Sequence, residues 1–303
     1  MLKDNKNCRK IRVLQGHIDA QEFHHQHLAL NLPLLVKGYA NQWRATQCWG
    51  TEYFRQKMGQ SQVVTKEFKP GGEIVMGKMP LNEYMDSVDD FEYRTANGDS
   101  RRIRPAYWHD VPIFELFPEL IADAEPFQAD LLPRFYQRDW HRYVQFFMSS
   151  AESVTKLHFD TLRTHNVFFQ IKGTKEWVLY PPEDMYRCGR NSWRWFDIDP
   201  DNPDVDSYPE YALAQPIRVR VEPGDMLYIP PGTLHHVKSL DTCISFNIDF
   251  HTPESVMDSF RYIRKGMPKK VVYYNLVSAL GVIAGLPSRW VFPFYKSYLN
   301  FVS

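Results

Sequence analysis

The chain has 303 residues, of which 44% are hydrophobic, so it can bury a core as one large domain or two small ones. Lys and Arg together number 36, as do Asp and Glu, and the formal net charge of +0 excludes a general attraction to nucleic acid or to anionic membranes. The scattered cysteines form no Cys-x-x-Cys pair, which argues against a zinc knuckle or a disulfide framework. No apolar run follows the charged N-terminus, so we expect a cytoplasmic protein without a secretory signal.

The first part of the chain predicts helices that alternate with short strands. Helices are indicated by apolar residues at helical spacing and by an Asp that can cap the first turn. Loops are indicated by polar stretches that contain glycine. The expected elements are a helix over 19–30 capped by Asp19, a short apolar run over 32–36, a helix ending at Gly59, a strand over 62–66 and a helix over 81–88, with loops at 70–77 and 97–104.

From residue 143 onward, β-branched and aromatic residues dominate, which is the composition of buried strands. Strands are expected over 143–148, 167–180, 218–221, 226–230 and 243–250. Gly173 lies between two apolar runs and predicts the tight turn of a hairpin. Residues 183–216 form a connection long enough to be a functional flap. The pattern favours a mainly β fold with flanking helices, an antiparallel sandwich or barrel of the jelly-roll type.

The stretch Leu157-His158-Phe159-Asp160 contains the first candidate site. In an extended segment His158 and Asp160 point to the same face, so they can bind one ion together. An imidazole and a carboxylate supply two ligands of a facial iron site, and His235, after a Pro-Pro-Gly turn, offers the third. There is an alternative interpretation without a metal. His158 could be a hydrogen-bonded histidine at a sheet edge, Asp160 could cap a turn, and His235 could belong to a polar rim. Joint occurrence of the three residues in a β-rich chain favours the metal site.

Further motifs follow in a recognisable order. They are His158-Phe159-Asp160, Asn166 to Lys175, Leu179-Tyr180-Pro181-Pro182, and Pro223-Gly224-Asp225 to Pro230 followed by His235. Together they resemble the core of the JmjC-type, cupin-like 2-oxoglutarate oxygenases, and the likeness runs from about residue 12 to about residue 255. The resemblance implies a double-stranded β-helix in an oxygenase domain over 1–255 with an N-terminal elaboration, and a C-terminal helical segment over 256–303.

The resemblance also implies a metal centre. Fe(II) would be bound by His158, Asp160 and His235, which would then be the catalytic residues. Strand alternation allows only one of His235 and His236 to face inward, and the motif spacing favours His235. The stretch between Asp160 and Asn166 is two residues longer than we expect of the hydroxylases that this chain most resembles, which places Arg163 and His165 near the mouth of the site.

A co-substrate site follows from the same resemblance. Lys175 would pair with the distal carboxylate of 2-oxoglutarate, for which an ammonium group is a suitable partner. Thr155 and Tyr107 would add hydroxyl hydrogen bonds to that carboxylate, and Asn166 and Asn247 would approach the iron-chelating end. The residues alone also allow simpler structural roles. Lys175 could be solvated, Asn166 and Asn247 could form hydrogen bonds at strand ends, and Tyr107 could belong to the core. The candidates for a dry aromatic lining are Phe168, Trp177 and Phe246.

The implied activity is that of a dioxygenase that uses Fe(II), 2-oxoglutarate and O₂. We expect it to hydroxylate a side chain of a peptide or protein, held by the flap over 183–216. Demethylation is less expected, because no zinc-binding reader module with its cysteine spacing is present in the sequence. The alternatives are an oxygenase acting on a small molecule or a tRNA base, and a metal-binding cupin-like protein without catalysis.

The apolar stretch over 271–286 is shorter than the roughly 20 residues that a membrane-spanning helix needs, so no transmembrane span is expected. Related hydroxylases form homodimers through C-terminal helices, and we interpret this stretch as a dimer or packing helix. Contact with a membrane surface, helped by Trp290, Phe292 and Phe294, is the alternative.

Overall fold

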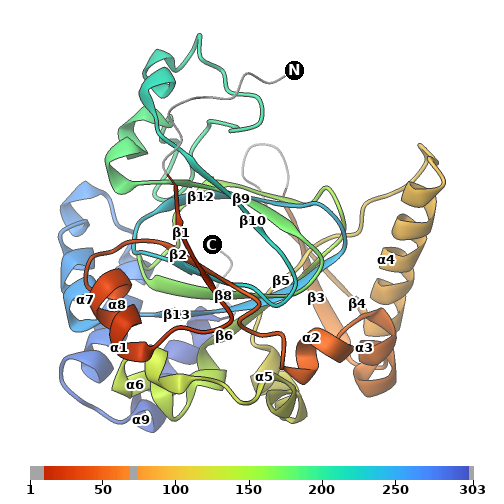
Figure 1. Cartoon of the computed structure of the whole chain (residues 1–303), viewed down its shortest axis with the longest axis horizontal. Helices are drawn as coiled ribbons and strands as arrows, with labels where there is room; N and C mark the ends of the chain where they lie inside the picture. The colour runs from red at the N-terminus through yellow and green to blue at the C-terminus, as the bar shows by residue number, and fades with distance from the viewer. Residues whose placement is uncertain (1–9, 69–73, 300–303) are drawn as a thin grey trace.

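Two β-sheets form the centre of the molecule, and helices flank them (Figure 1). The computed structural model describes residues 10–68 and 74–299. The large sheet has the strand order β1-β2-β11-β8-β13-β6-β5, and the small sheet has the order β10-β9-β12-β7. Strands β1 and β2 run parallel, whereas the inner pairs of both sheets are antiparallel. The predicted class, mainly β with flanking helices, is confirmed.

The large sheet contains β1 (Arg12–Gln15), β2 (Leu34–Lys37), β5 (Trp108–Val111), β6 (Val144–Ser149), β8 (His165–Lys172), β11 (Met226–Ile229) and β13 (Cys243–Phe250). The small sheet contains β7 (Val154–His158), β9 (Lys175–Tyr180), β10 (Ile217–Val221) and β12 (Leu234–Ser239). From β6 to β13 the chain therefore crosses repeatedly between the two sheets.

The predicted hairpin around Gly173 is wrong. Strand β8 pairs with β11 and β13 in the large sheet, whereas β9 pairs with β10 and β12 in the small one. Gly173 has φ +71°, and an added Cβ would lie 2.3 Å from the carbonyl oxygen of Thr242. The glycine is therefore required by a turn that carries the chain from one sheet to the other.

The N-terminal elements agree with the sequence in part. The first helix, α1 (Ala20–Glu22), continues as a π-helical turn over Phe23–Leu28, and Asp19 caps it by accepting from the amides of Gln21 and Glu22. The predicted loop at 70–77 is wrong for its second half, because β4 (Ile74–Pro80) pairs with β3 (Gln62–Phe68); residues 70–73 lie outside the described residues. The other helices of this region are α2 (Arg44–Cys48), α3 (Thr51–Met58) and α4 (Leu81–Ala96), and α4 is twice as long as predicted.

Side-chain alternation in the large sheet creates two cores. One face of β8 and β13 carries Phe169 and Phe246, which pack with Trp43 against the helices. The opposite face carries Phe168, which joins Trp177 of β9 in the space between the sheets. The space between the sheets also contains polar side chains, so it can hold a functional site.

The C-terminal helices pack against the same large core. They are α7 (Pro253–Phe260), α8 (Lys269–Val282) and α9 (Ser288–Tyr295), and shorter helical turns include α5 (Ile113–Leu116) and α6 (Arg134–Gln137). The side chain of Asn275 is fully buried and bonds to His251 at 3.1 Å and Ser259 at 2.9 Å, which fixes α8 to the end of β13. Within the described ranges, no helix is both long and apolar enough to cross a membrane.

Candidate active site

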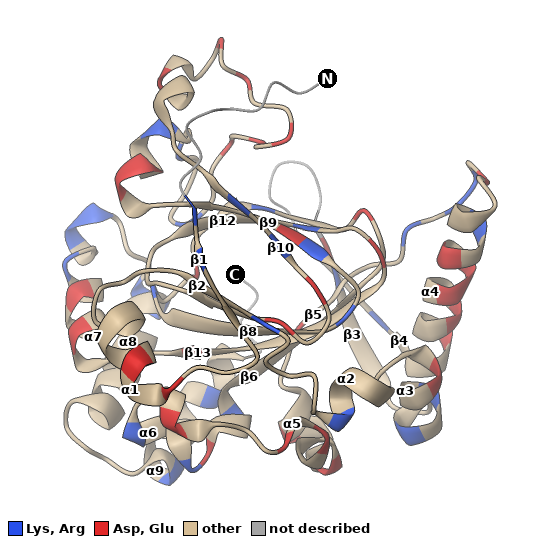
Figure 2. Cartoon of the chain, viewed as in Figure 1, with Lys and Arg blue, Asp and Glu red and all other residues tan. Residues whose placement is uncertain are grey.

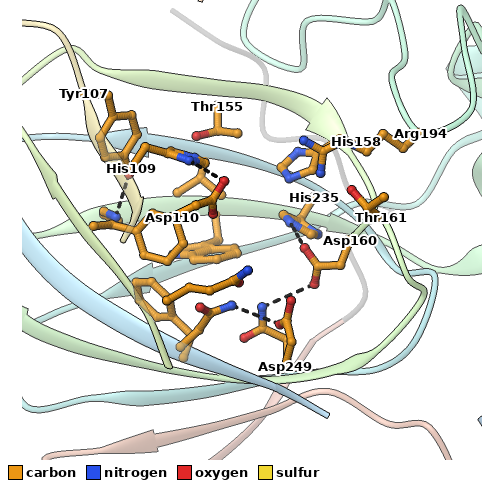
Figure 3. A pocket seen from close by; sticks show the side chains of 18 of the residues that line it. Tyr107, His109, Asp110, Thr155, His158, Asp160, Thr161, Arg194, His235 and Asp249 are labelled. Atoms are coloured by element: carbon orange, nitrogen blue, oxygen red, sulfur yellow. Dashed lines mark hydrogen bonds and ion pairs between the residues drawn. The ribbon is translucent and has the colours of Figure 1, made fainter. Parts of the chain in front are cut away.

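A cavity lies between the two sheets, and strands from both contribute its walls (Figure 3). All the predicted iron ligands and co-substrate residues line it. The lining residues are Tyr107, His109, Asp110, Gln145, Phe147, Thr155, His158, Asp160, Thr161, Asn166, Phe168, Lys175, Trp177, Arg194, His235, Val237, Asn247, Asp249 and Tyr298.

His158, Asp160 and His235 come together at this cavity, with one ligand atom of each within 4.8 Å of the others. Nε2 of His235 lies 3.6 Å from Oδ1 of Asp160. Nδ1 of His158 lies 2.7 Å from the carbonyl oxygen of Lys156, and Nδ1 of His235 lies 3.2 Å from that of Thr233. Since a carbonyl only accepts, each Nδ1 donates and each Nε2 keeps a free lone pair, as a metal ligand requires.

Burial also suits the two histidines to metal binding. It is the main cause that lowers the pKa of both imidazoles, so they are neutral at physiological pH. His236, the neighbour of His235, points elsewhere and has Nε2 4.0 Å from Asp199. The prediction that His235 is the inward residue of the pair is confirmed.

A bulge in β7 explains how Thr155 reaches the cavity. Thr155 and His158 are three residues apart, which in a regular strand places them on opposite faces. They pair with Val237 and His235, which are only two apart, and the register shifts between these pairs. The extra residue on β7 lets both side chains face the cavity.

Lys175 is 2% exposed and lies deep in the same cavity. Its ammonium group donates to the hydroxyls of Tyr107 at 3.1 Å and Ser245 at 2.9 Å. Among the described residues no carboxylate pairs with it, and burial lowers its pKa to about 8. The arrangement is a buried cation with hydroxyl neighbours and no resident anion, which is a suitable seat for a carboxylate.

Asn166 and Asn247 lie on the neighbouring strands β8 and β13. Nδ2 of Asn166 donates to Oδ2 of Asp160 at 3.2 Å, which orients that carboxylate. Nδ2 of Asn247 donates to Asp249 at 3.0 Å. The Oδ1 atoms of both amides are buried without a hydrogen-bond partner among the described residues. Both therefore keep an acceptor for a bound group.

Two expectations from the sequence are wrong. Phe246 lies on the helix-facing side of β13, where its ring stacks against Trp43 at 5.8 Å, so it does not line the cavity. His165 was placed near the mouth, but it is buried, with Nδ1 2.8 Å from the hydroxyl of Tyr228. The prediction for the lining residues Phe168 and Trp177 is confirmed.

Sequence reasoning missed several polar residues that line the cavity or bond to its lining residues. Ser245 and Asp249 share a strand face with Asn247, and this two-residue spacing is the signal that could have found them. Asp110 has φ +58° and its carboxylate lies 2.8 Å from Nδ1 of His109 and 3.0 Å from Nζ of Lys66. These neighbours hold the pKa of Asp110 well below its usual range despite burial.

The long connection over 183–216 also reaches the cavity. Its Trp195 forms a β-bridge with His158, and its Arg194 lines the cavity beside Thr161 (Figure 3). The predicted flap therefore lies directly against the candidate metal ligands.

Comparison with known proteins agrees with this geometry. A family profile described as "Cupin-like domain" matches residues 20–255. The chain belongs to the cupin-like domain family. The resemblance to JmjC-type, cupin-like oxygenases is confirmed by relatives whose names include a lysyl hydroxylase, a 2-oxoglutarate and iron-dependent oxygenase and a JmjC domain-containing protein.

Three relatives illustrate the range of proteins to which this chain is similar. Human "Bifunctional peptidase and (3S)-lysyl hydroxylase JMJD7" is 25% identical over 262 residues, covering 74% of this chain and 79% of the relative. Chicken (Gallus gallus) "2-oxoglutarate and iron-dependent oxygenase JMJD4" is 25% identical over 262 residues, covering 77% and 60%. Zebrafish (Danio rerio) "tRNA wybutosine-synthesizing protein 5" is 30% identical over 177 residues, covering 58% and 50%. The chain thus spans less than two thirds of the last two proteins.

The residues present fit an iron ion. Two neutral imidazoles with free Nε2 atoms and one carboxylate are the donor set of a facial triad, which leaves coordination positions for other ligands. Asn166 provides the outer hydrogen bond to the carboxylate that such sites need.

Proposed function

We propose that this protein is an Fe(II)- and 2-oxoglutarate-dependent oxygenase that hydroxylates a side chain of a peptide or protein. His158, Asp160 and His235 hold the iron. Lys175, with Tyr107, Thr155 and Ser245 beside it, holds the distal carboxylate of 2-oxoglutarate. Asn166 and Asn247 approach the end of the co-substrate that chelates iron.

The observation that carries the proposal is the position of Lys175. A buried ammonium without an anion is costly, and evolution tolerates such a cost mainly at functional sites. Lys175 lies in the same cavity as the triad. One dicarboxylate could therefore pair with the ammonium group at one end and bind the metal at the other. A protein that bound only a metal would gain nothing from this lysine.

When bound, the iron and 2-oxoglutarate supply activation of O₂ for oxidation of a C–H bond, with succinate and carbon dioxide as co-products. The protein supplies orientation. The two backbone carbonyls fix the imidazole rings, and Asn166 fixes the Asp160 carboxylate. Phe147, Phe168 and Trp177 exclude water from the inner wall.

The substrate side chain is proposed to be basic. The carboxyl group of Asp249 lines the cavity in addition to the iron ligand Asp160, and burial raises its pKa, as do the charges of Asp160 and Asp110, so a cationic group bound beside it would favour its charged form. The name of the human relative, a lysyl hydroxylase, supports the same class. A tRNA base, the alternative that the zebrafish relative suggests, is less favoured: acidic and basic residues are mixed over the molecule, and α4 carries mainly acidic ones (Figure 2).

The test uses the full chain with Fe(II), 2-oxoglutarate, air and a library of lysine-containing peptides. We expect succinate to form and some peptides to gain one oxygen atom. Both products should be lost in His158→Ala and Lys175→Ala and kept in His236→Ala. Binding of Fe(II) and 2-oxoglutarate without any succinate would refute the enzyme and leave the non-catalytic alternative.

The order in which β6 to β13 cross between the sheets supports a double-stranded β-helix of the jelly-roll type over the part of the chain before residue 255. Residues 256–303 are proposed as a separate C-terminal helical segment that packs on this domain. A cytoplasmic location stays a prediction.

We further propose that the outer face of this segment forms a homodimer. Exposed apolar side chains follow α8 at helical spacing and continue on α9: Tyr273, Leu276, Leu280, Ile283, Trp290 and Phe294. Deletion of the segment would uncover the core, so surface substitutions are the better test. Leu276→Glu with Leu280→Glu should halve the mass in solution; a parent that is monomeric and binds lipid vesicles would contradict the dimer.

A further inference from the structure

Tyr298 lines the same cavity as the candidate iron ligands, although it lies in the C-terminal segment. Apart from Tyr298 and Arg194, the lining residues lie in strands of the two sheets or directly beside them. Tyr298 ends a short helical turn, Lys296–Tyr298, that follows α9. The segment that the sequence assigned to packing or dimerisation therefore also supplies part of the cavity wall.

Packing fixes the ring of Tyr298. It is 7% exposed, and its ring centroid lies 5.4 Å from that of Tyr274 and 5.3 Å from that of Tyr295. The hydroxyl of Tyr274 also bonds to that of Ser297 at 2.9 Å, and Leu299 is buried in the main core. These contacts hold the ring as a wall of the cavity.

Several charged neighbours act on the hydroxyl of Tyr298, and they include residues of the reactive end of the cavity. Burial raises the pKa of Tyr298, and the carboxylates of Asp249, Asp160 and Asp110 raise it further, whereas Arg194 opposes them. The phenol is therefore a neutral hydrogen-bond donor among carboxylates at physiological pH. One of those carboxylates, Asp160, belongs to the candidate metal triad.

The cavity has two distinct ends. Tyr107 and Thr155 lie at one end, and Arg194 and Thr161 lie beside the triad at the other (Figure 3). Lys175 bonds to Tyr107, so the proposed co-substrate end is already assigned. Tyr298 lines the cavity, and the charges that act on it are those of Asp249, Asp160, Asp110 and Arg194. Two of these, Asp160 and Arg194, lie at the end left for the substrate.

We propose that Tyr298 is a specificity-determining residue, whose ring closes the substrate side of the iron site and limits what reaches the iron. This inference rests on the proposed oxygenase function. It assigns a role in the active site to the C-terminal segment, which the matched family region, residues 20–255, does not include.

The test compares Tyr298→Ala and Tyr298→Phe with the parent as full chains. Binding of Fe(II) and 2-oxoglutarate is first measured without oxygen from the visible charge-transfer absorption. Consumption of 2-oxoglutarate in air, with no peptide added, is then measured per bound co-substrate. Because the alanine variant admits water to the site, its consumption should rise at least threefold, whereas the phenylalanine variant, which keeps the ring, should stay within about twofold of the parent.

Phe292→Ala is the matched control. Phe292 packs on Tyr143 at 5.5 Å and anchors α9 without lining the cavity, so its loss loosens the segment and leaves the wall in place. Unchanged consumption in Tyr298→Ala, or an equal rise in Phe292→Ala, would overturn the role of Tyr298. Absence of the absorption band in the parent would instead refute the proposed function, so the two failures are distinguishable.

Discussion

Lys175 connects the physical chemistry of one residue with the proposed function. Its pKa is lowered to about 8 by burial, so the empty site loses the positive charge as the pH rises through 8. A bound carboxylate favours the ammonium form and raises this pKa. Affinity for 2-oxoglutarate should therefore be constant below pH 8 and fall roughly tenfold per pH unit above it.

The measurement is an anaerobic titration of the Fe(II)-loaded protein with 2-oxoglutarate between about pH 6.5 and 9.5. Lys175→Arg is the control, because guanidinium stays charged over this range and should give a flat profile even if its affinity is lower. A parent profile that stays flat above pH 8 would show that the charge of Lys175 does not bind the co-substrate.

The same lysine should reduce stability. Below pH 8 the folded protein contains a buried ammonium without a carboxylate partner among the described residues. Lys175→Met removes this charge at similar volume and should raise the free energy of unfolding at pH 7 by about 1–3 kcal/mol, while weakening co-substrate binding. Because the folded-state pKa lies below the unfolded-state value of about 10.4, the gain should disappear as the pH rises from 8 towards 10. Urea unfolding at pH 7 and pH 9.5 measures it; a less stable variant would contradict the account.

At the residue scale, the sequence alone could suggest His158, Asp160 and His235, because histidine and aspartate are common metal ligands and can be recognised by residue type. It could not decide between a solvated and a buried Lys175, since burial depends on strands brought together by the fold. The resemblance supplied that role. Asp110 and Arg194 gave no sequence signal, because their neighbours come from distant segments.

At the element scale, the turn at Gly173 sets the position of Lys175 two residues later. Gly173→Ala introduces a Cβ 2.3 Å from a backbone carbonyl and also strains a residue with φ +71°. Gly98 has φ +67° with nothing within 4 Å of an added Cβ, so Gly98→Ala measures the strain alone. We expect a loss of about 1 kcal/mol for Gly98→Ala and about 2–4 kcal/mol for Gly173→Ala, measured by denaturant unfolding. Equal losses would mean that the crossing between the sheets tolerates the clash.

The hairpin prediction failed because local patterns show where strands and turns lie and do not show which strands pair. The segments on both sides of Gly173 are strands, as predicted. However, β8 pairs with β13 in the large sheet, whereas β9 pairs with β12 in the small sheet. The bulge in β7 is likewise set by its pairing with β12, so strand alternation alone predicts the wrong face for Thr155.

At the scale of the whole molecule, the site depends on segments far apart in the chain. The two sheets supply the triad and the co-substrate end, the connection over 183–216 supplies Arg194, and the C-terminal segment supplies Tyr298. The sequence could indicate a β-rich class, a metal site and a flap, because composition and residue type carry them. The approach of the C-terminal segment to the cavity is a product of tertiary packing, and no local pattern predicts it.

The measurement that tests the central claim most directly is an anaerobic titration of metal-free protein with Fe(II) and then 2-oxoglutarate. The account predicts visible charge-transfer absorption that develops only when both are present. This absorption should be lost in His235→Ala, weakened in Lys175→Ala and kept in His236→Ala, whose side chain lies beside His235 but faces Asp199. Iron binding without the absorption at saturating 2-oxoglutarate, or equal loss in the His235 and His236 variants, would contradict it.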